Sequence, residues 1–100
     1  MNIQQLEYII AVDNYRHFSK AAEASFVTQP TLSMMIQKLE EELGVKIFDR
    51  SQLPVQPTEI GTRIINQARQ ALSQVNLIRE IVQEEKGVVK GVFRLAIIPT

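Results

Sequence analysis

The stretch from Thr62 to Lys86 contains neither proline nor glycine, and it restricts the possible folds of this chain more than any other feature. Thr58 is a suitable N-cap ahead of this stretch, and Glu59 suits the positive end of a helix dipole. The pattern therefore predicts one long helix over 58–86. At roughly 1.5 Å per residue this helix would be about 43 Å long.

The apolar residues of the long helix lie on one stripe, separated by steps of three or four residues. That spacing is close to the heptad seam of a coiled coil. The rest of the chain is too small to cover such a rod along its whole length, so we expect a second copy of the chain to cover the seam. The alternative is that other elements of a longer chain bury it. The predicted dimerisation seam consists of Ile60, Ile64, Ala68, Ala71, Val75, Ile78 and Val82.

Two shorter helices are predicted near the N-terminus. Asn2 and Gln5 form a capping pair at the start of the first, which we expect to end at Asp13-Asn14. The second runs from about Ser19 to Ala24 and contains small residues that let another helix approach closely.

A third helix is predicted to begin after the N-cap Thr28, with Pro30 in its first turn and Gly44 as its left-handed stop. The acidic run Glu40–Glu42 is expected to be a solvated helix end. One apolar stripe along this helix is expected to be buried, namely Leu32, Ile36, Leu39 and Leu43.

Strands are predicted after the third helix and at the C-terminal end. Val45–Asp49 and Val55–Pro57 form two short strands around residues 51–54. Gly87 and Gly91 bracket a predicted hinge, and Val92–Ile98 has the composition of a buried strand. Because a single strand is unstable without neighbours, we expect a further domain beyond residue 100.

Composition excludes several classes of protein. No apolar run reaches the roughly 18 residues of a membrane span, and the N-terminus lacks a signal peptide, so we expect a cytoplasmic protein with no membrane partner. Cysteine is absent and His17 is the single histidine, so we expect no metal and no cofactor. No nucleophile–base pair or phosphate loop is visible, and we therefore expect no enzymatic activity.

The second helix, the turn after it and the third helix form a predicted helix-turn-helix over about 18–37, whose recognition helix 29–42 would enter the major groove of DNA. Glutamine can hydrogen-bond adenine there, and threonine or proline can contact the thymine methyl group. Arg50 lies in the wing and is expected to contact the DNA backbone. The candidate DNA-binding residues are Thr28, Gln29, Pro30, Thr31, Ser33, Met34, Gln37, Lys38 and Arg50.

The charge of the first 60 residues argues against a simple DNA-binding surface. These residues hold five basic and eight acidic side chains, a net charge of −3, whereas DNA-binding domains usually carry a basic stripe. If the domain binds DNA, its bases must lie on one face and its acids on another. The alternative is a winged-helix module that binds another protein and not DNA.

Several short motifs occur together along the chain. They include Leu6-Glu7-Tyr8, Phe18-Ser19-Lys20-Ala21-Ala22, Val27-Thr28-Gln29-Pro30-Thr31-Leu32-Ser33, Leu43-Gly44-Val45, Phe48-Asp49-Arg50 and Thr58-Glu59-Ile60-Gly61. With these motifs the sequence resembles the LysR-type transcriptional regulators of bacteria. Arg16-His17-Phe18 and Ile98-Pro99-Thr100 are most similar to the peroxide-responsive OxyR branch of that family.

Together, the patterns and the resemblance predict a mainly α fold. A winged helix-turn-helix of three helices and a two-stranded wing would occupy 1–58, and a linker and dimerisation helix 59–88. The hinge and first strand of an incomplete α/β effector domain would occupy 89–100. The resemblance implies a sequence-specific regulator, an activator in the OxyR branch, that binds an inverted repeat in double-stranded DNA as a homodimer. It also implies pairing into a tetramer and makes RNA polymerase a candidate partner.

The sequence departs from the family pattern in two places, the wing and residue 34. The wing residues 51–56 carry no charge, although this wing is usually basic. Met34 stands where the family often has arginine. Both departures indicate weaker contact with phosphates, or a greater dependence on the assembly of several DNA-binding heads.

Overall fold

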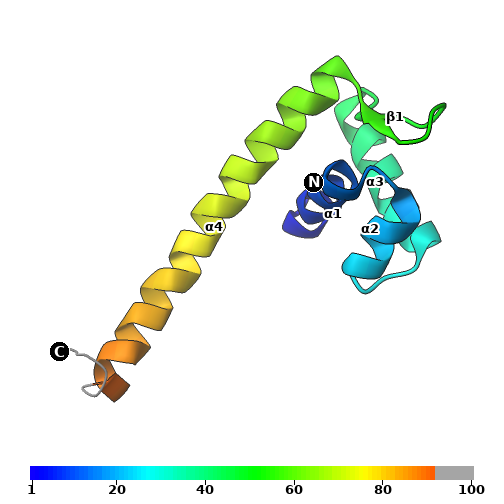
Figure 1. The fold of residues 1–100 in the computed structure, drawn as a ribbon. Coiled ribbons are helices and arrows are strands. Elements are labelled where there is room, and N and C mark those ends of the chain that lie inside the picture. The colour runs from blue at the N-terminus through cyan, green and yellow to red at the C-terminus, as the bar shows by residue number, and fades with distance from the viewer. Residues whose placement is uncertain (92–100) are drawn as a thin grey trace.

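The structure, a computed structural model, describes the backbone of residues 1–91 and the side chains of residues 1–87. Within this part of the chain the elements are α1 (Ile3–Tyr15), α2 (Phe18–Ala24), α3 (Gln29–Leu43), β1 (Phe48–Asp49), β2 (Gln56–Pro57) and α4 (Glu59–Gly91). Figure 1 shows α1, α2 and α3 packed together with the strands beside α3, while α4 extends away as a rod. This architecture confirms the predicted winged helix-turn-helix followed by a long helix. The predicted strand Val92–Ile98 lies outside the described residues.

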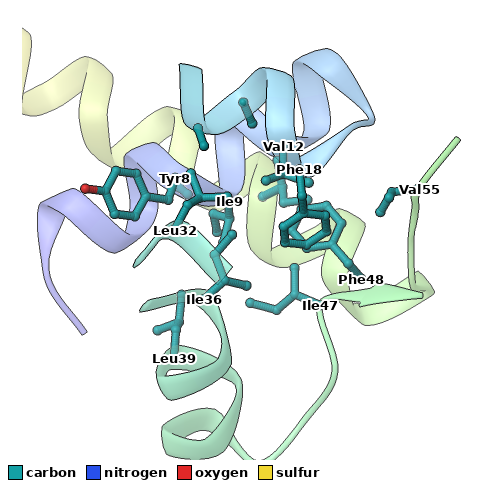
Figure 2. Close-up of a cluster of buried hydrophobic side chains, with 14 residues drawn as sticks. Tyr8, Ile9, Val12, Phe18, Leu32, Ile36, Leu39, Ile47, Phe48 and Val55 are labelled. Atoms are coloured by element: carbon teal, nitrogen blue, oxygen red, sulfur yellow. The ribbon is translucent and has the colours of Figure 1, made fainter. Parts of the chain in front are cut away.

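One hydrophobic core joins α1, α2, α3, the wing and the first turns of α4. In Figure 2, Val12 of α1 and the α3 residues Leu32 and Ile36 lie in one cluster with the aromatic rings of α2 and the wing. The rings of Phe18 and Phe48 meet edge to face, with their centroids 6.0 Å apart. Burial of these apolar side chains is the main favourable term in folding, and it fixes α3 against the rest of the domain.

The first helix begins as its sequence predicts. The Asn2 side chain accepts a hydrogen bond from the backbone N–H of Gln5 at 2.8 Å, and the Gln5 side chain accepts one from the N–H of Asn2 at 3.1 Å. The helix runs one residue past the predicted Asp13-Asn14 end, to Tyr15. Arg16 then ends it in the left-handed conformation, where its backbone N–H still bonds to a carbonyl of the last turn.

The buried stripe of α3 differs from the prediction at its C-terminal end. Leu43, expected in the core, is 36% exposed, whereas Glu40, expected in solvent, is 4% exposed. The Glu40 carboxylate accepts hydrogen bonds from the backbone N–H groups of Ile47 at 2.7 Å and Phe48 at 3.3 Å. The chain turns back at Gly44 and brings these amides to α3, so an acceptor fits at position 40 better than a solvated charge.

The wing is a minimal antiparallel pair in which Phe48 lies opposite Pro57 and Asp49 opposite Gln56. Its strands are shorter than predicted. The start of α4 lies very close to the backbone just before β1. A Cβ atom added at Gly61 would lie 2.0 Å from the carbonyl oxygen of Ile47. Glycine is therefore required where α4 passes Ile47, the residue before β1.

The long helix begins at a Thr58 cap, as predicted, since the Thr58 hydroxyl accepts from the N–H of Gly61 at 2.9 Å. It then continues through Gly87 to Gly91. The hinge predicted between these two glycines is therefore wrong for the described residues up to 91, because the helix does not break there. Glycine weakens a helix interior without necessarily ending it.

The first turns of α4 lie against α1, and this changes the predicted seam. Ala68, expected to face a second chain, is 3% exposed and belongs to the core of its own chain. Ile64 is also packed partly against that core. Arg69 adds an ion pair with Asp13 at 2.6 Å and a hydrogen bond to Asn14 at 3.0 Å. The near end of α4 is thus fixed to the domain. Within the described part of α4, the exposed large apolar side chains other than Ile60 all lie toward its far end.

Candidate nucleic-acid interface

The exposed side of α3 carries almost all of the predicted DNA-contacting residues. The buried residues of this helix face α1 and α2, so the opposite side is left to solvent. The N-terminal half of that side holds no acidic residue, and Glu41 is the first along it. The residues exposed there are Gln29, Pro30, Thr31, Met34, Gln37 and Lys38, with the N-cap Thr28 beside them.

The start of α3 holds a small hydroxyl cluster. Thr28 caps the helix by accepting a hydrogen bond from the backbone N–H of Thr31 at 3.3 Å. The Thr28 hydroxyl also donates to the Thr31 hydroxyl at 2.9 Å. The Thr31 hydroxyl proton is then left to donate outward, toward an acceptor such as a phosphate or a base edge.

The wing reaches this face through Arg50. Its Nη1 donates to the Ser33 hydroxyl oxygen at 2.6 Å, which joins the wing to the middle of α3. The guanidinium carbon lies 4.3 Å from the centroid of the Phe18 ring. Arg50 remains exposed, and Ser33 is half-buried beneath it. The structure therefore brings all nine candidate residues to one side of the domain.

A shallow hollow lies between α2, α3 and the wing, next to this face. His17 lies beside it as the N-cap of α2, since its Nδ1 accepts a hydrogen bond from the backbone N–H of Lys20 at 3.2 Å. No spacing in the sequence indicates that α2 shares a hollow with the wing, because they are far apart along the chain. The hollow is lined by His17, Phe18, Ser19, Gln29, Arg50, Leu53 and Val55.

The acidic side chains are distributed so that the net charge of −3 does not describe this face. Half of the eight acids of residues 1–60 are held by partners within the domain. Glu40 is buried, Glu42 pairs with the N-terminal ammonium group, and Asp13 pairs with Arg16 and Arg69. The hydroxyl and backbone N–H of Ser51 donate to Asp49 and lower the pKa of that carboxyl. Four basic side chains of α2, α3 and the segment that follows α3 are exposed, namely Lys20, Lys38, Lys46 and Arg50.

Arg16 is committed to the structure. Its Nε donates to the Asp13 carbonyl oxygen at 2.9 Å, and its Nη1 donates to Gln56 in β2 at 2.9 Å. Its own carbonyl oxygen accepts from the N–H of Val55 at 3.0 Å. Arg16 therefore links α1 to the wing.

Among the residues that the structure describes, no group of three or more histidine, cysteine, aspartate or glutamate side chains is placed to hold a metal ion. The helices described are all too short or too polar to span a membrane.

Comparison with known proteins gives a consistent result. Residues 3–62 match the family model described as a bacterial regulatory helix-turn-helix protein, lysR family. The chain is 40% identical over 100 residues to the DNA-binding transcriptional dual regulator OxyR of Escherichia coli K12. This match covers all of this chain and 33% of that protein. The chain thus spans about a third of the length of this curated relative.

Solved structures agree with the sequence comparison. A full-length OxyR from Pseudomonas aeruginosa is 45% identical and superposes with a TM-score of 0.80, over 84% of this chain and 28% of that one. The DNA-binding domain of BenM in complex with catB site 1 DNA is 35% identical, with a TM-score of 0.82 over 86% of this chain and 97% of that one.

Proposed function

Because the chain belongs to the lysR family of bacterial regulatory helix-turn-helix proteins, we propose that it reads specific sequences in double-stranded DNA as the DNA-binding end of a transcription regulator. The observation that carries this proposal is the exposed side of α3, where polar and small side chains converge without an acidic residue until Glu41. A major groove admits one such helix, and its base edges are read by groups of this kind.

The side chains divide into two roles. Gln29 and Gln37 present amides that can bond an adenine edge, while Pro30 and Met34 present apolar surface that suits a thymine methyl group. Phosphate contact falls to the hydroxyls at the start of α3, to Lys38 at its flank, and to Arg50 from the wing. The base contacts of α3 then give sequence specificity, and the phosphate contacts fix the position of the domain along the duplex.

The far half of α4 supports binding as a homodimer. Its apolar side chains Leu77, Ile78, Ile81 and Val82 are exposed in the single chain. A stripe of this kind on a helix is covered when a second helix packs against it. Two such chains would present two copies of α3, which matches an inverted repeat with half-sites about one helical turn, or a multiple of it, apart.

The relatives suggest a role for the whole protein. Two relatives from Escherichia coli are named hydrogen peroxide-inducible genes activators. By analogy, the chain would be part of a cytoplasmic, peroxide-responsive activator that carries no catalytic activity. In that role α4 would link an effector domain to the DNA-binding domain, tetramers would form on DNA, and RNA polymerase would be the downstream partner.

Selection of binding sites from a random pool of duplex DNA tests the proposal. The wild-type chain should enrich an inverted repeat, with an affinity that falls as salt rises. Gln37→Ala should relax the preference at one position of each half-site, whereas Glu41→Ala, one helical turn further along, serves as a matched control. A folded, dimeric chain that enriches no sequence would refute the proposal and favour the protein-binding alternative.

A further inference from the structure

The Arg50 guanidinium is held from two sides in the free chain. Its Nη1 donates to the Ser33 hydroxyl at 2.6 Å, and its central carbon lies 4.3 Å from the centroid of the Phe18 ring. Phe18 is itself fixed, because it is buried in the core and its ring meets the edge of Phe48 at an interplanar angle of 78°. The ring therefore acts as a rigid plate beneath an otherwise exposed arginine.

This arrangement restricts the freedom of Arg50. A cation within about 6 Å of a ring centroid is attracted by the negative face of the ring. A free arginine side chain must give up its rotamer freedom when it binds a phosphate, and this loss weakens binding. A guanidinium already confined to one position loses less of that freedom.

The same contact sets the direction of the Ser33 hydroxyl. Because its oxygen accepts from Arg50, its proton is left to act as a donor. Ser33 lies on α3 between Gln29 and Gln37, at the edge of the face proposed to enter the groove. A fixed Arg50 thus orders a donor within α3 as well as a cation on the wing.

We propose that Phe18 is a positioning residue for DNA binding. Its ring holds the Arg50 guanidinium against Ser33, so that Arg50 meets a backbone phosphate in a preset orientation and Ser33 presents its hydroxyl as a donor. Phe18 acts through Arg50 and contacts no DNA itself. This inference rests on the proposed function, and it adds a residue of α2 to a site otherwise built from α3 and the wing.

The test uses the 100-residue chain and a duplex obtained by selection, with affinity measured over a range of salt concentrations. Phe18→Leu should weaken binding by about tenfold and reduce the slope of log Kd against log salt by about one, as Arg50→Ala does. Phe18→Tyr keeps the ring face and should restore both values. Tyr8→Leu is the matched control, since it removes a buried ring on α1 that takes no part in the contact between Phe18 and Arg50, and it should leave the salt slope unchanged.

A double-mutant cycle completes the test. In the Phe18→Leu background, Arg50→Ala should weaken binding by no more than about twofold further, because the preset arginine is already lost. Equal effects of Arg50→Ala in both backgrounds would overturn the proposal, as would a Phe18→Leu chain with wild-type affinity and salt slope. A wild-type chain that binds no duplex overturns the proposed function as well, so the two failures are distinguishable.

A spectroscopic measurement needs no DNA. The side-chain Nε–H proton of Arg50 should show a ring-current shift in the NMR spectrum of the wild type and of Phe18→Tyr, and this shift should vanish in Phe18→Leu. If the folded wild type shows no such ring-current shift, the proposal is overturned.

Discussion

Glu40→Ala should destabilise the chain strongly, although it removes a single carboxylate from an acidic run. The Glu40 carboxylate is buried and accepts the backbone N–H groups of Ile47 at 2.7 Å and Phe48 at 3.3 Å. Each buried N–H left without a partner costs about 1–3 kcal/mol. Because the second bond is long, we expect a loss of about 3 kcal/mol in the free energy of unfolding.

Urea and thermal unfolding followed by circular dichroism measure this loss. For a chain of this size a change of 1 kcal/mol moves the midpoint by about 4–8 °C, so Glu40→Ala should lower the melting temperature by at least about 10 °C. Glu40→Gln keeps an acceptor oxygen and should fall between the alanine variant and the wild type. Glu41→Ala, the exposed neighbour, should change stability by less than about 0.5 kcal/mol. Equal, small effects of the two alanine variants would refute the assigned role of Glu40.

Three further changes test other parts of the structure. Gly61→Ala should lower the free energy of unfolding, measured in urea, by about 1–3 kcal/mol, because the added Cβ would lie 2.0 Å from the Ile47 carbonyl oxygen. A more stable variant would contradict this close approach. Phe26→Gly should raise the free energy of unfolding by about 1 kcal/mol, because Phe26 is 94% exposed and its φ of 59° is strained for a residue with a Cβ atom. A lower urea midpoint would show instead that the ring makes a stabilising contact. Ile78→Glu should weaken dimerisation at least roughly tenfold in analytical ultracentrifugation, because Ile78 is 62% exposed in the single chain and lies on the proposed seam. The control Ser73→Glu should leave the dimer intact, and equal dissociation of both variants would contradict the seam.

The parts of the fold that depend on neighbouring residues could be predicted from the sequence. The capping pair of Asn2 and Gln5, the Thr28 cap and the Gly44 stop are all local, because each depends on contacts within one helical turn. The exposed side of α3, which carries most of the candidate residues, could be predicted for the same reason. Helical periodicity fixes which residues lie opposite a buried stripe.

The parts that depend on tertiary packing could not be predicted. Glu40 is buried because the chain reverses at Gly44 and returns two amides to it, and nothing in the acidic run indicates that return. Ala68 fits a heptad seam by spacing, but α1 covers it because the first turns of α4 lie alongside that helix. The contact of Phe18 with Arg50 joins residues distant in sequence, and it has no local signature.

The exposed side of α3, together with Arg50, is the surface that we propose meets DNA. The most direct test is an NMR titration of the chain with a selected duplex, following backbone amide and arginine side-chain resonances. We expect the largest shifts at residues 28–38 and at Arg50, with little change on the α1 surface away from the wing. Saturable binding whose shifts lie on α1 or α4, with α3 unaffected, would contradict the claim.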